Sequence, residues 1–152
     1  MAFEIPNKLT KLQRLLSSYD IDREIDLLNK KLEKEIVKLN QNQIRFGRRS
    51  DNSVIQPPYA GLTIALKYKA GKLTNNNPNI VNLYDTGAFY AGFYVNVTSN
   101  EIIIDSTDSK TEDLKDKYQE TIFGLNENNL QIVLEKIRTE LTTNLKNKLN
   151  AL

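Results

Sequence analysis

Apolar residues recur at helical spacing in two long stretches of this 152-residue chain, one towards each end. The first predicts a helix over 20–42, with Asp20 as its N-cap, and the second a helix over 126–150, capped by Asn126. Their apolar stripes are Ile21, Ile25, Leu28, Leu32, Ile36 and Leu39, and Leu130, Leu134, Ile137, Leu141, Leu145 and Leu149. A shorter helix is predicted over 7–18. Each of these helices is amphipathic, so each needs a core or a partner to cover one face.

The period changes to two after residue 92, where Phe93, Val95 and Val97 alternate with polar or aromatic neighbours. A Thr-Ser-Asn turn and the run 102–104 follow, which predicts a β-hairpin at about 93–105. Residues 111–123 predict a short helix. We therefore expect a single α+β domain over residues 1–152, in which long N- and C-terminal helices pack on a small antiparallel sheet.

The middle of the chain, residues 43–82, has no sustained period and is rich in turn-forming residues. Within it, only residues 62–68 suggest a short helix or strand. A long irregular stretch in a compact domain usually has a function or a neighbour that holds it. We expect a loop or arm here that makes contacts with other molecules and orders on assembly.

The amino-acid composition excludes several kinds of functional site. The chain has no cysteine and no histidine, so disulfides, thiolate zinc sites, cysteine nucleophiles and histidine bases are all excluded. We expect no catalytic residues, no cofactor and no metal. The sequence also shows no secretory signal pattern and no apolar run near the ~18 residues of a membrane span, so we expect a cytosolic product with no membrane partner.

Charge is unevenly spread, although the formal net charge is only +2. Residues 1–84 carry 14 Lys and Arg against 8 Asp and Glu, whereas residues 85–152 carry 7 against 11. This asymmetry suits head-to-tail contact between copies, and solvated helix faces would give the same counts. Basic residues in the middle of the chain are candidates for interface or phosphate contacts, or are ordinary loop residues: Arg45, Arg48, Arg49, Lys67, Lys69 and Lys72. The acidic residues over 105–116 lack the spacing of a calcium loop and favour a solvated face.

The most distinctive short motif is Asp85-Thr86-Gly87, followed by Ala88. In aspartic proteases this motif supplies one of two carboxylates that share a proton, and retroviral-type enzymes obtain the second from a dimer partner. The alternative is structural, with Asp85 or Thr86 capping a short helix that begins at Ala88. We favour the structural interpretation because the preceding residues include the polar Asn82.

Two blocks together resemble a known family. The first runs from Leu83 through Asp85-Thr86-Gly87 to Val95, and the second from Ile122 through Phe123-Gly124-Leu125 to Leu130. This order is similar to that of the bacteriophage virion-morphogenesis family of tail-completion proteins. The resemblance covers about residues 80–145.

The resemblance implies a non-enzymatic structural subunit of the virion neck, found in the virion and in the host cytoplasm during assembly. Its implied partners are further copies in a homo-oligomeric ring, portal or head-closure proteins and tail proteins, with DNA in the channel as a further candidate contact. Asp85, Thr86 and Gly87 would fix the turn into a short helix, and Gly124 and Leu125 would set the direction of the last helix. A helical interaction module outside the phage world is the alternative.

Overall fold

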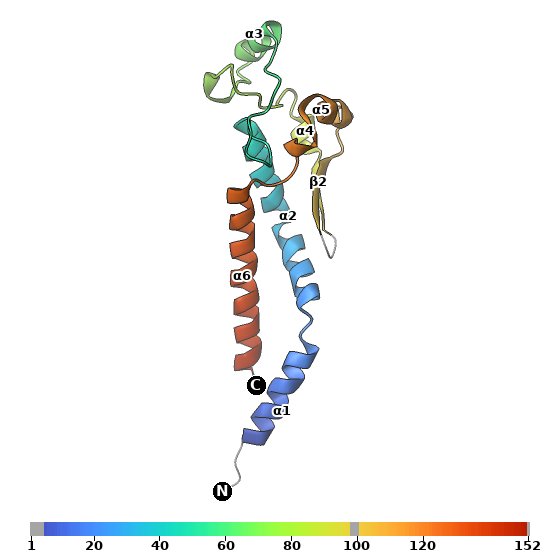
Figure 1. The fold of residues 1–152 in the computed structure, drawn as a ribbon, viewed down its shortest axis with the longest axis vertical. Helices are drawn as coiled ribbons and strands as arrows, with labels where there is room; N and C mark the ends of the chain where they lie inside the picture. The colour runs from blue at the N-terminus through green and yellow to red at the C-terminus, as the bar shows by residue number, and fades with distance from the viewer. Residues whose placement is uncertain (1–4, 98–100, 152) are drawn as a thin grey trace.

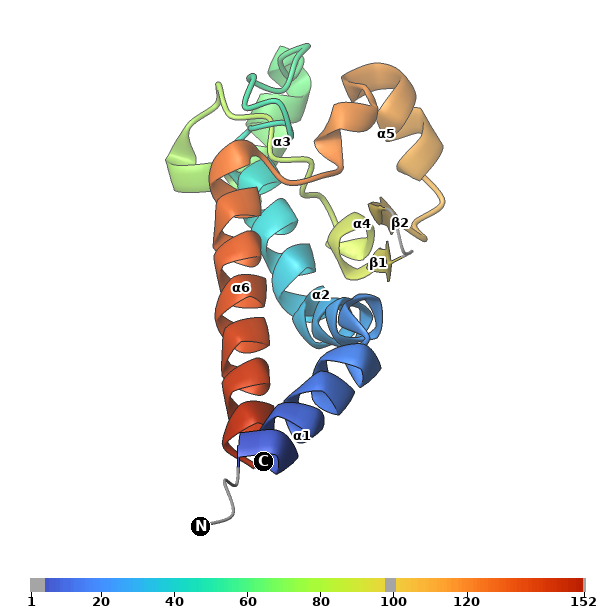
Figure 2. The same cartoon turned by 60° about the horizontal axis from the view of Figure 1, so that its bottom comes forward.

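The computed structural model describes residues 5–97 and 101–151 and has the expected α+β architecture. Three helices form an elongated stalk: α1 (Ile5–Ser18), α2 (Ile21–Arg45) and α6 (Glu127–Asn150). A smaller head continues from the end of the stalk where α2 ends and α6 begins (Figure 1). The start of α1 and the end of α6 lie together at the opposite end, which a second view confirms (Figure 2). Within the described residues, no helix is both long and apolar enough to cross a membrane.

Helices α2 and α6 pack side by side and antiparallel. Both predicted N-caps are confirmed: the Asp20 side chain accepts a hydrogen bond from the Arg23 N–H, and the Asn126 side chain accepts one from the Asn129 N–H, each at 3.0 Å. Three ion pairs follow one register across the two helices: Glu24 with Lys148 at 2.8 Å, Lys31 with Glu140 at 2.7 Å, and Glu35 with Lys136. Exposed ion pairs contribute little free energy, so burial of apolar side chains is what stabilises the contact between α2 and α6. The ion pairs help to set the register of the two helices.

The predicted hairpin is present as β1 (Phe93–Val97) and β2 (Ile102–Ser106), which pair antiparallel with Val95 opposite Ile104. The Thr-Ser-Asn turn predicted between them lies outside the described residues. Strand β1 packs against α2, so the sheet is covered by the N-terminal long helix, as the amphipathic pattern of residues 20–42 indicates.

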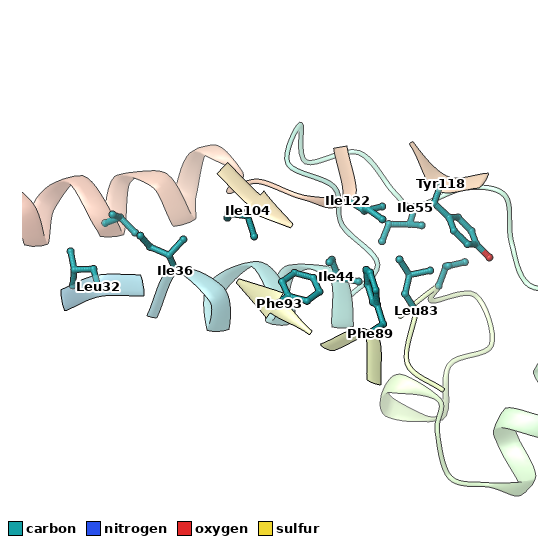
Figure 3. Close-up of a cluster of buried hydrophobic side chains, with 12 residues drawn as sticks. Leu32, Ile36, Ile44, Ile55, Leu83, Phe89, Phe93, Ile104, Tyr118 and Ile122 are labelled. Carbon is teal, nitrogen blue, oxygen red and sulfur yellow. The ribbon is translucent and has the colours of Figure 1, made fainter. Parts of the chain in front are cut away.

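The main core lies where α2, the hairpin and several irregular segments meet (Figure 3). Its aromatic centre includes Phe89 and Phe93, whose ring centroids are 5.1 Å apart in an edge-to-face arrangement. The buried members of this core are Leu32, Ile36, Ile44, Ile55, Val81, Leu83, Phe89, Phe93, Ile104, Tyr118, Ile122 and Val133.

The predicted arm at 43–82 needs correction. Helix α2 continues to Arg45, and a 3₁₀ turn η1 (Thr74–Asn76) is also present. The short helix or strand suggested at 62–68 is a helix, α3 (Gly61–Lys69). Two apolar residues anchor the segment: Ile44 and Ile55 are fully buried in the core. Ile44 continues the buried stripe of α2, whereas Ile55 is a single buried residue outside any helix or strand. The segment is therefore irregular in part but belongs to the domain.

The predicted helix over 111–123 is two elements, α5 (Thr111–Tyr118) and the 3₁₀ turn η2 (Glu120–Ile122). Gln119 separates them with a φ of 72°, a left-handed conformation that ends α5. The break turns Ile122 into the core, where it is fully buried.

Candidate functional site

An open cleft of about 750 Å³ lies in the head, beside the Asp85-Thr86-Gly87 turn. Helix α3 and the residues around the turn form its walls, together with residues 108–118. Apolar surface predominates in this cleft, and its lining also includes five charged residues: Lys67, Lys72, Asp85, Asp108 and Lys110. A cleft with apolar walls and a few convergent polar groups is the usual place to look for a functional site.

Asn82 is the centre of the hydrogen-bond network behind this cleft, and it is only 3% exposed. Its Oδ1 accepts hydrogen bonds from the Tyr59 hydroxyl at 3.1 Å and from Lys67 Nζ at 3.0 Å. Its Nδ2 donates to the Lys72 carbonyl oxygen at 2.8 Å and to Thr74 Oγ1 at 3.0 Å. One amide side chain thus joins α3, η1 and the segment that enters the Asp85 turn.

Lys67 is 7% exposed, which corrects its assignment as a surface basic residue. Its ammonium also donates to the Tyr84 carbonyl oxygen and lies 4.9 Å from the centroid of the Tyr59 ring. Burial lowers the pKa of Lys67, because desolvation penalises the charged form. No carboxylate within 5–97 and 101–151 forms a salt bridge with this ammonium, so neutral oxygens and a ring face hold it. Its evident role is to fix α3 against residues 82–84.

Two tyrosines complete the network. The Tyr59 hydroxyl accepts the Leu83 N–H at 2.8 Å, and the Tyr90 hydroxyl donates to the Asn82 carbonyl oxygen at 2.6 Å. Burial raises the pKa of Tyr59 to about 12 and also raises the pKa of Tyr90, since the phenolate would lose its hydration. Both hydroxyls therefore stay protonated at neutral pH and serve as structural hydrogen-bonding groups.

In the Asp85-Thr86-Gly87 turn, the Asp85 side chain contacts lysines and does not cap the following helix. The Asp85 carboxylate lies 3.2 Å from Lys72 Nζ and 4.0 Å from Lys110 Nζ, and it is mostly exposed. Gly87 occupies the N-cap position of α4 and no side chain caps this helix, so the predicted cap at Asp85 or Thr86 is wrong. Thr86 Oγ1 instead accepts the Ala88 N–H at 3.2 Å within the turn. Gly87 has a φ of 93°, so the chain reaches the four-residue helix α4 (Ala88–Ala91) through a left-handed conformation that favours glycine. The charged groups that contact Asp85 are lysines, an environment unlike that of a carboxylate pair sharing a proton.

The second motif, Phe123-Gly124-Leu125, lies where η2 leads into α6. Two polar side chains of α2 hold it: Asn40 Oδ1 accepts the Gly124 N–H at 3.3 Å, and Gln43 Nε2 donates to the Gly124 carbonyl oxygen at 3.1 Å. Gln43 Oε1 also accepts the Asn126 N–H at 2.8 Å, at the N-cap of α6. The direction of α6 is thus fixed from α2 through the backbone of this motif.

The remaining basic candidates differ in exposure, and Arg45 lines a small pocket together with Lys72. Arg49 is 8% exposed and structural, because its guanidinium donates to Gln119 Oε1 at 3.1 Å and to the Gln56 carbonyl oxygen at 2.9 Å. Arg45, Arg48 and Lys69 are exposed.

Two of the acidic residues over 105–116 form ion pairs with one lysine: Lys115 lies 2.9 Å from Asp105 and 3.0 Å from Glu112. The described part of the chain contains no group of three or more acidic residues placed to hold a metal ion.

Sequence patterns assign no organising role to Asn82, Asn40 or Gln43, although these three side chains hold the two motifs in place. Asn82 leaves a trace in the sequence as a single polar residue between Val81 and Leu83, a context typical of a buried, hydrogen-bonded side chain. Asn40 and Gln43 leave no such trace in the sequence, because polar residues are common near the end of a long helix.

Comparison of the chain with models of protein families, with curated proteins and with solved structures found no match in any of the three.

Proposed function

We propose that this protein is a non-enzymatic structural subunit of a bacteriophage virion, of the tail-completion type that joins head and tail in the neck. The two sequence blocks at 83–95 and 122–130 support the family, as a resemblance. One structural observation carries the proposal of a subunit: large apolar side chains are exposed on all the longer helices except α5. They are Leu9, Leu16, Ile21, Leu27, Leu62, Leu66, Leu130, Ile132, Leu134 and Leu149.

The distribution of these side chains suits assembly. A surface helix that functions alone normally turns its large apolar residues inwards, and exposed apolar patches mark interaction sites. Here they lie on the stalk and on the head, so a subunit would meet several neighbours along its length (Figure 1). An elongated molecule with such a surface is suited to a position between two larger structures.

The cleft supports a structural role as well. Lys67, Tyr59 and Tyr90 are the groups whose pKa values burial changes, and all three are engaged in hydrogen bonds within the chain. Groups held in this way position the backbone around Asp85. We therefore propose that Asp85, Thr86 and Gly87 shape the head and take no part in catalysis.

Deletion of the gene in the phage that carries it tests this proposal. We expect filled heads and tails that fail to join, with infectivity restored by the gene supplied in trans. Mass spectrometry of purified wild-type particles should then find the protein in a fixed ratio to the portal protein. Normal particles from the deletion strain, with the protein absent from wild-type virions, would overturn the proposal.

A further inference from the structure

We infer that Arg45 and Lys72 form a binding site for the phosphoryl group of a small phosphate monoester, whose organic part lies in the adjoining cleft of the head. The inference goes beyond the proposed role in the virion and does not depend on it. The site is a second, smaller pocket of about 300 Å³ at the C-terminal end of α2. Its lining includes Arg45, Lys72, Thr74 and Tyr84.

A chain of hydrogen bonds holds the two cationic residues at one pocket, although they are distant in the sequence. Thr74 Oγ1 donates to the Arg45 carbonyl oxygen at 2.7 Å and accepts a hydrogen bond from Asn82 Nδ2 at 3.0 Å. The same Nδ2 donates to the Lys72 carbonyl oxygen at 2.8 Å. Thr74 and Asn82 are both buried, so the backbone that carries each cation is fixed before a ligand binds.

The side chains around this pocket have donors to spare. Within residues 5–97 and 101–151, the Arg45 guanidinium and the Tyr84 hydroxyl form no hydrogen bond. The Lys72 ammonium has three protons and contacts one carboxylate oxygen, that of Asp85, at 3.2 Å. A phosphoryl group has three terminal oxygens, so the guanidinium can bind two of them and the ammonium the third. A carboxylate has only two oxygens and a single charge.

The charges around the pocket and the cleft favour an anionic ligand. Among all the residues that line either space, four are cationic and two are anionic: Arg45, Lys67, Lys72 and Lys110, against Asp85 and Asp108. Asp85 is shared between Lys72 and Lys110, at 3.2 and 4.0 Å, so it neutralises neither ammonium alone. A second anion beside Asp85 would therefore meet a net positive environment.

The cleft is suited to the organic part of such a ligand. Lys72 and Tyr84 line both the small pocket and the cleft, so the two spaces adjoin. Polar surface predominates in the small pocket, whereas apolar surface predominates in the cleft of about 750 Å³. A monoester with a phosphoryl group at one end and an aromatic or aliphatic body at the other matches this division.

Isothermal titration calorimetry on the purified protein, at constant ionic strength, tests the site with phenyl phosphate, inorganic phosphate and benzoate. Phenyl phosphate should bind about tenfold more tightly than inorganic phosphate, because the ring buries apolar surface in the cleft. It should also bind about tenfold more tightly than benzoate, which lacks the third oxygen and the second charge. No binding of phenyl phosphate, or equal binding of phenyl phosphate and either of the other two probes, would overturn the inference.

Variants locate the binding. Arg45→Gln and Lys72→Gln should each weaken phenyl phosphate binding about tenfold, since each removes a hydrogen bond to a charged group. Arg48→Gln is the control, because Arg48 is an exposed arginine that lines neither space, and its loss should change binding about twofold or less. Asp85→Asn should tighten binding about threefold by removing a competing carboxylate. Equal losses in Arg45→Gln and Arg48→Gln would show general attraction of anions and overturn the inference.

A short oligonucleotide without a terminal phosphate separates a monoester site from a surface for nucleic-acid backbone. Its phosphodiesters carry one charge each and have two terminal oxygens, so it should bind more weakly than phenyl phosphate at the same ionic strength. Binding as tight as that of phenyl phosphate, with a steep decline as salt rises, would assign Arg45 and Lys72 to a nucleic-acid backbone and overturn the inference.

Discussion

Asn40 of α2 donates a hydrogen bond from Nδ2 to the carbonyl oxygen of Ile122, 82 residues later in the chain, at 3.1 Å. Both residues are fully buried. The other atom of the same amide, Oδ1, accepts the Gly124 N–H. A single side chain therefore satisfies two backbone groups in the segment that leads to α6.

Asn40→Leu should accordingly destabilise the protein more than its change in volume suggests. The leucine removes the side-chain partner of the buried Ile122 carbonyl and of the partly buried Gly124 N–H, at a cost of about 2–4 kcal/mol in the free energy of unfolding. Urea denaturation followed by circular dichroism measures the loss. Asn42→Leu is the matched control, because Asn42 is exposed on the same helix and its replacement should change stability by about 0.5 kcal/mol or less. Equal effects of the two variants would show that the Asn40 contacts contribute nothing.

Gly124→Ala tests the motif itself. Gly124 has a φ of 103°, and a Cβ there would lie 3.1 Å from Ser50 Cβ. Left-handed strain and this close contact should together cost about 1–3 kcal/mol. Gly61→Ala is the control, since a Cβ at the start of α3 meets nothing within 4 Å, and it should leave stability unchanged or raise it by up to about 1 kcal/mol. A Gly124→Ala protein as stable as the control would contradict this account of the turn.

The sequence predicted the parts of the fold that depend on local periodicity. The stripes over 20–42 and 126–150, the caps Asp20 and Asn126 and the alternation from Phe93 all appear where the pattern placed them. Each of these signals is carried by residues close together in the chain, where spacing alone determines which face is buried.

The site could not be predicted in the same way. From the sequence, Lys67 and Arg49 are candidates for interface or phosphate contacts, yet both are buried. What buries them is a set of acceptors elsewhere in the chain, Asn82 for Lys67 and Gln119 for Arg49. Contacts between positions 15 and 70 residues apart leave no local period, so only the folded chain reveals them.

Tyr59 should make stability depend on pH in the alkaline range. Burial raises its pKa from the ordinary 10.0 to about 12, so the folded chain keeps this proton at pH values where the unfolded chain loses it. The stabilisation is fully present below about pH 10 and is lost as pH rises towards 12. Tyr59→Phe should be less stable at neutral pH, because the Leu83 N–H loses its acceptor, and should decline less steeply above pH 10. Urea titrations at several pH values provide the test, with the exposed Tyr94→Phe as control. A Tyr59→Phe curve parallel to that of the wild type would contradict the assignment.

Asp85→Asn should have little effect. The carboxylate is mostly exposed, and its pairs with Lys72 and Lys110 are worth about 0–1 kcal/mol together, less in high salt. Urea denaturation at low and high salt measures this. We also expect no pepstatin-sensitive cleavage of peptides at acidic pH. Cleavage that disappears in Asp85→Asn would restore the aspartic protease interpretation.

Limited trypsin digestion should separate the two parts of residues 43–82. Lys69 is exposed at the end of α3 and precedes the turn at Gly71, so the chain there can enter a protease with little unfolding. Arg49 is buried, and the next backbone N–H, that of Ser50, donates to the Thr121 carbonyl oxygen at 2.7 Å. We expect early cleavage after Lys69 and none after Arg49 before global unfolding, as read from fragment masses. Early cleavage after Arg49 would show that the anchors at Ile44 and Ile55 fail to hold the segment, whereas resistance at Lys69 in dilute protein would place α3 in the core of the free subunit.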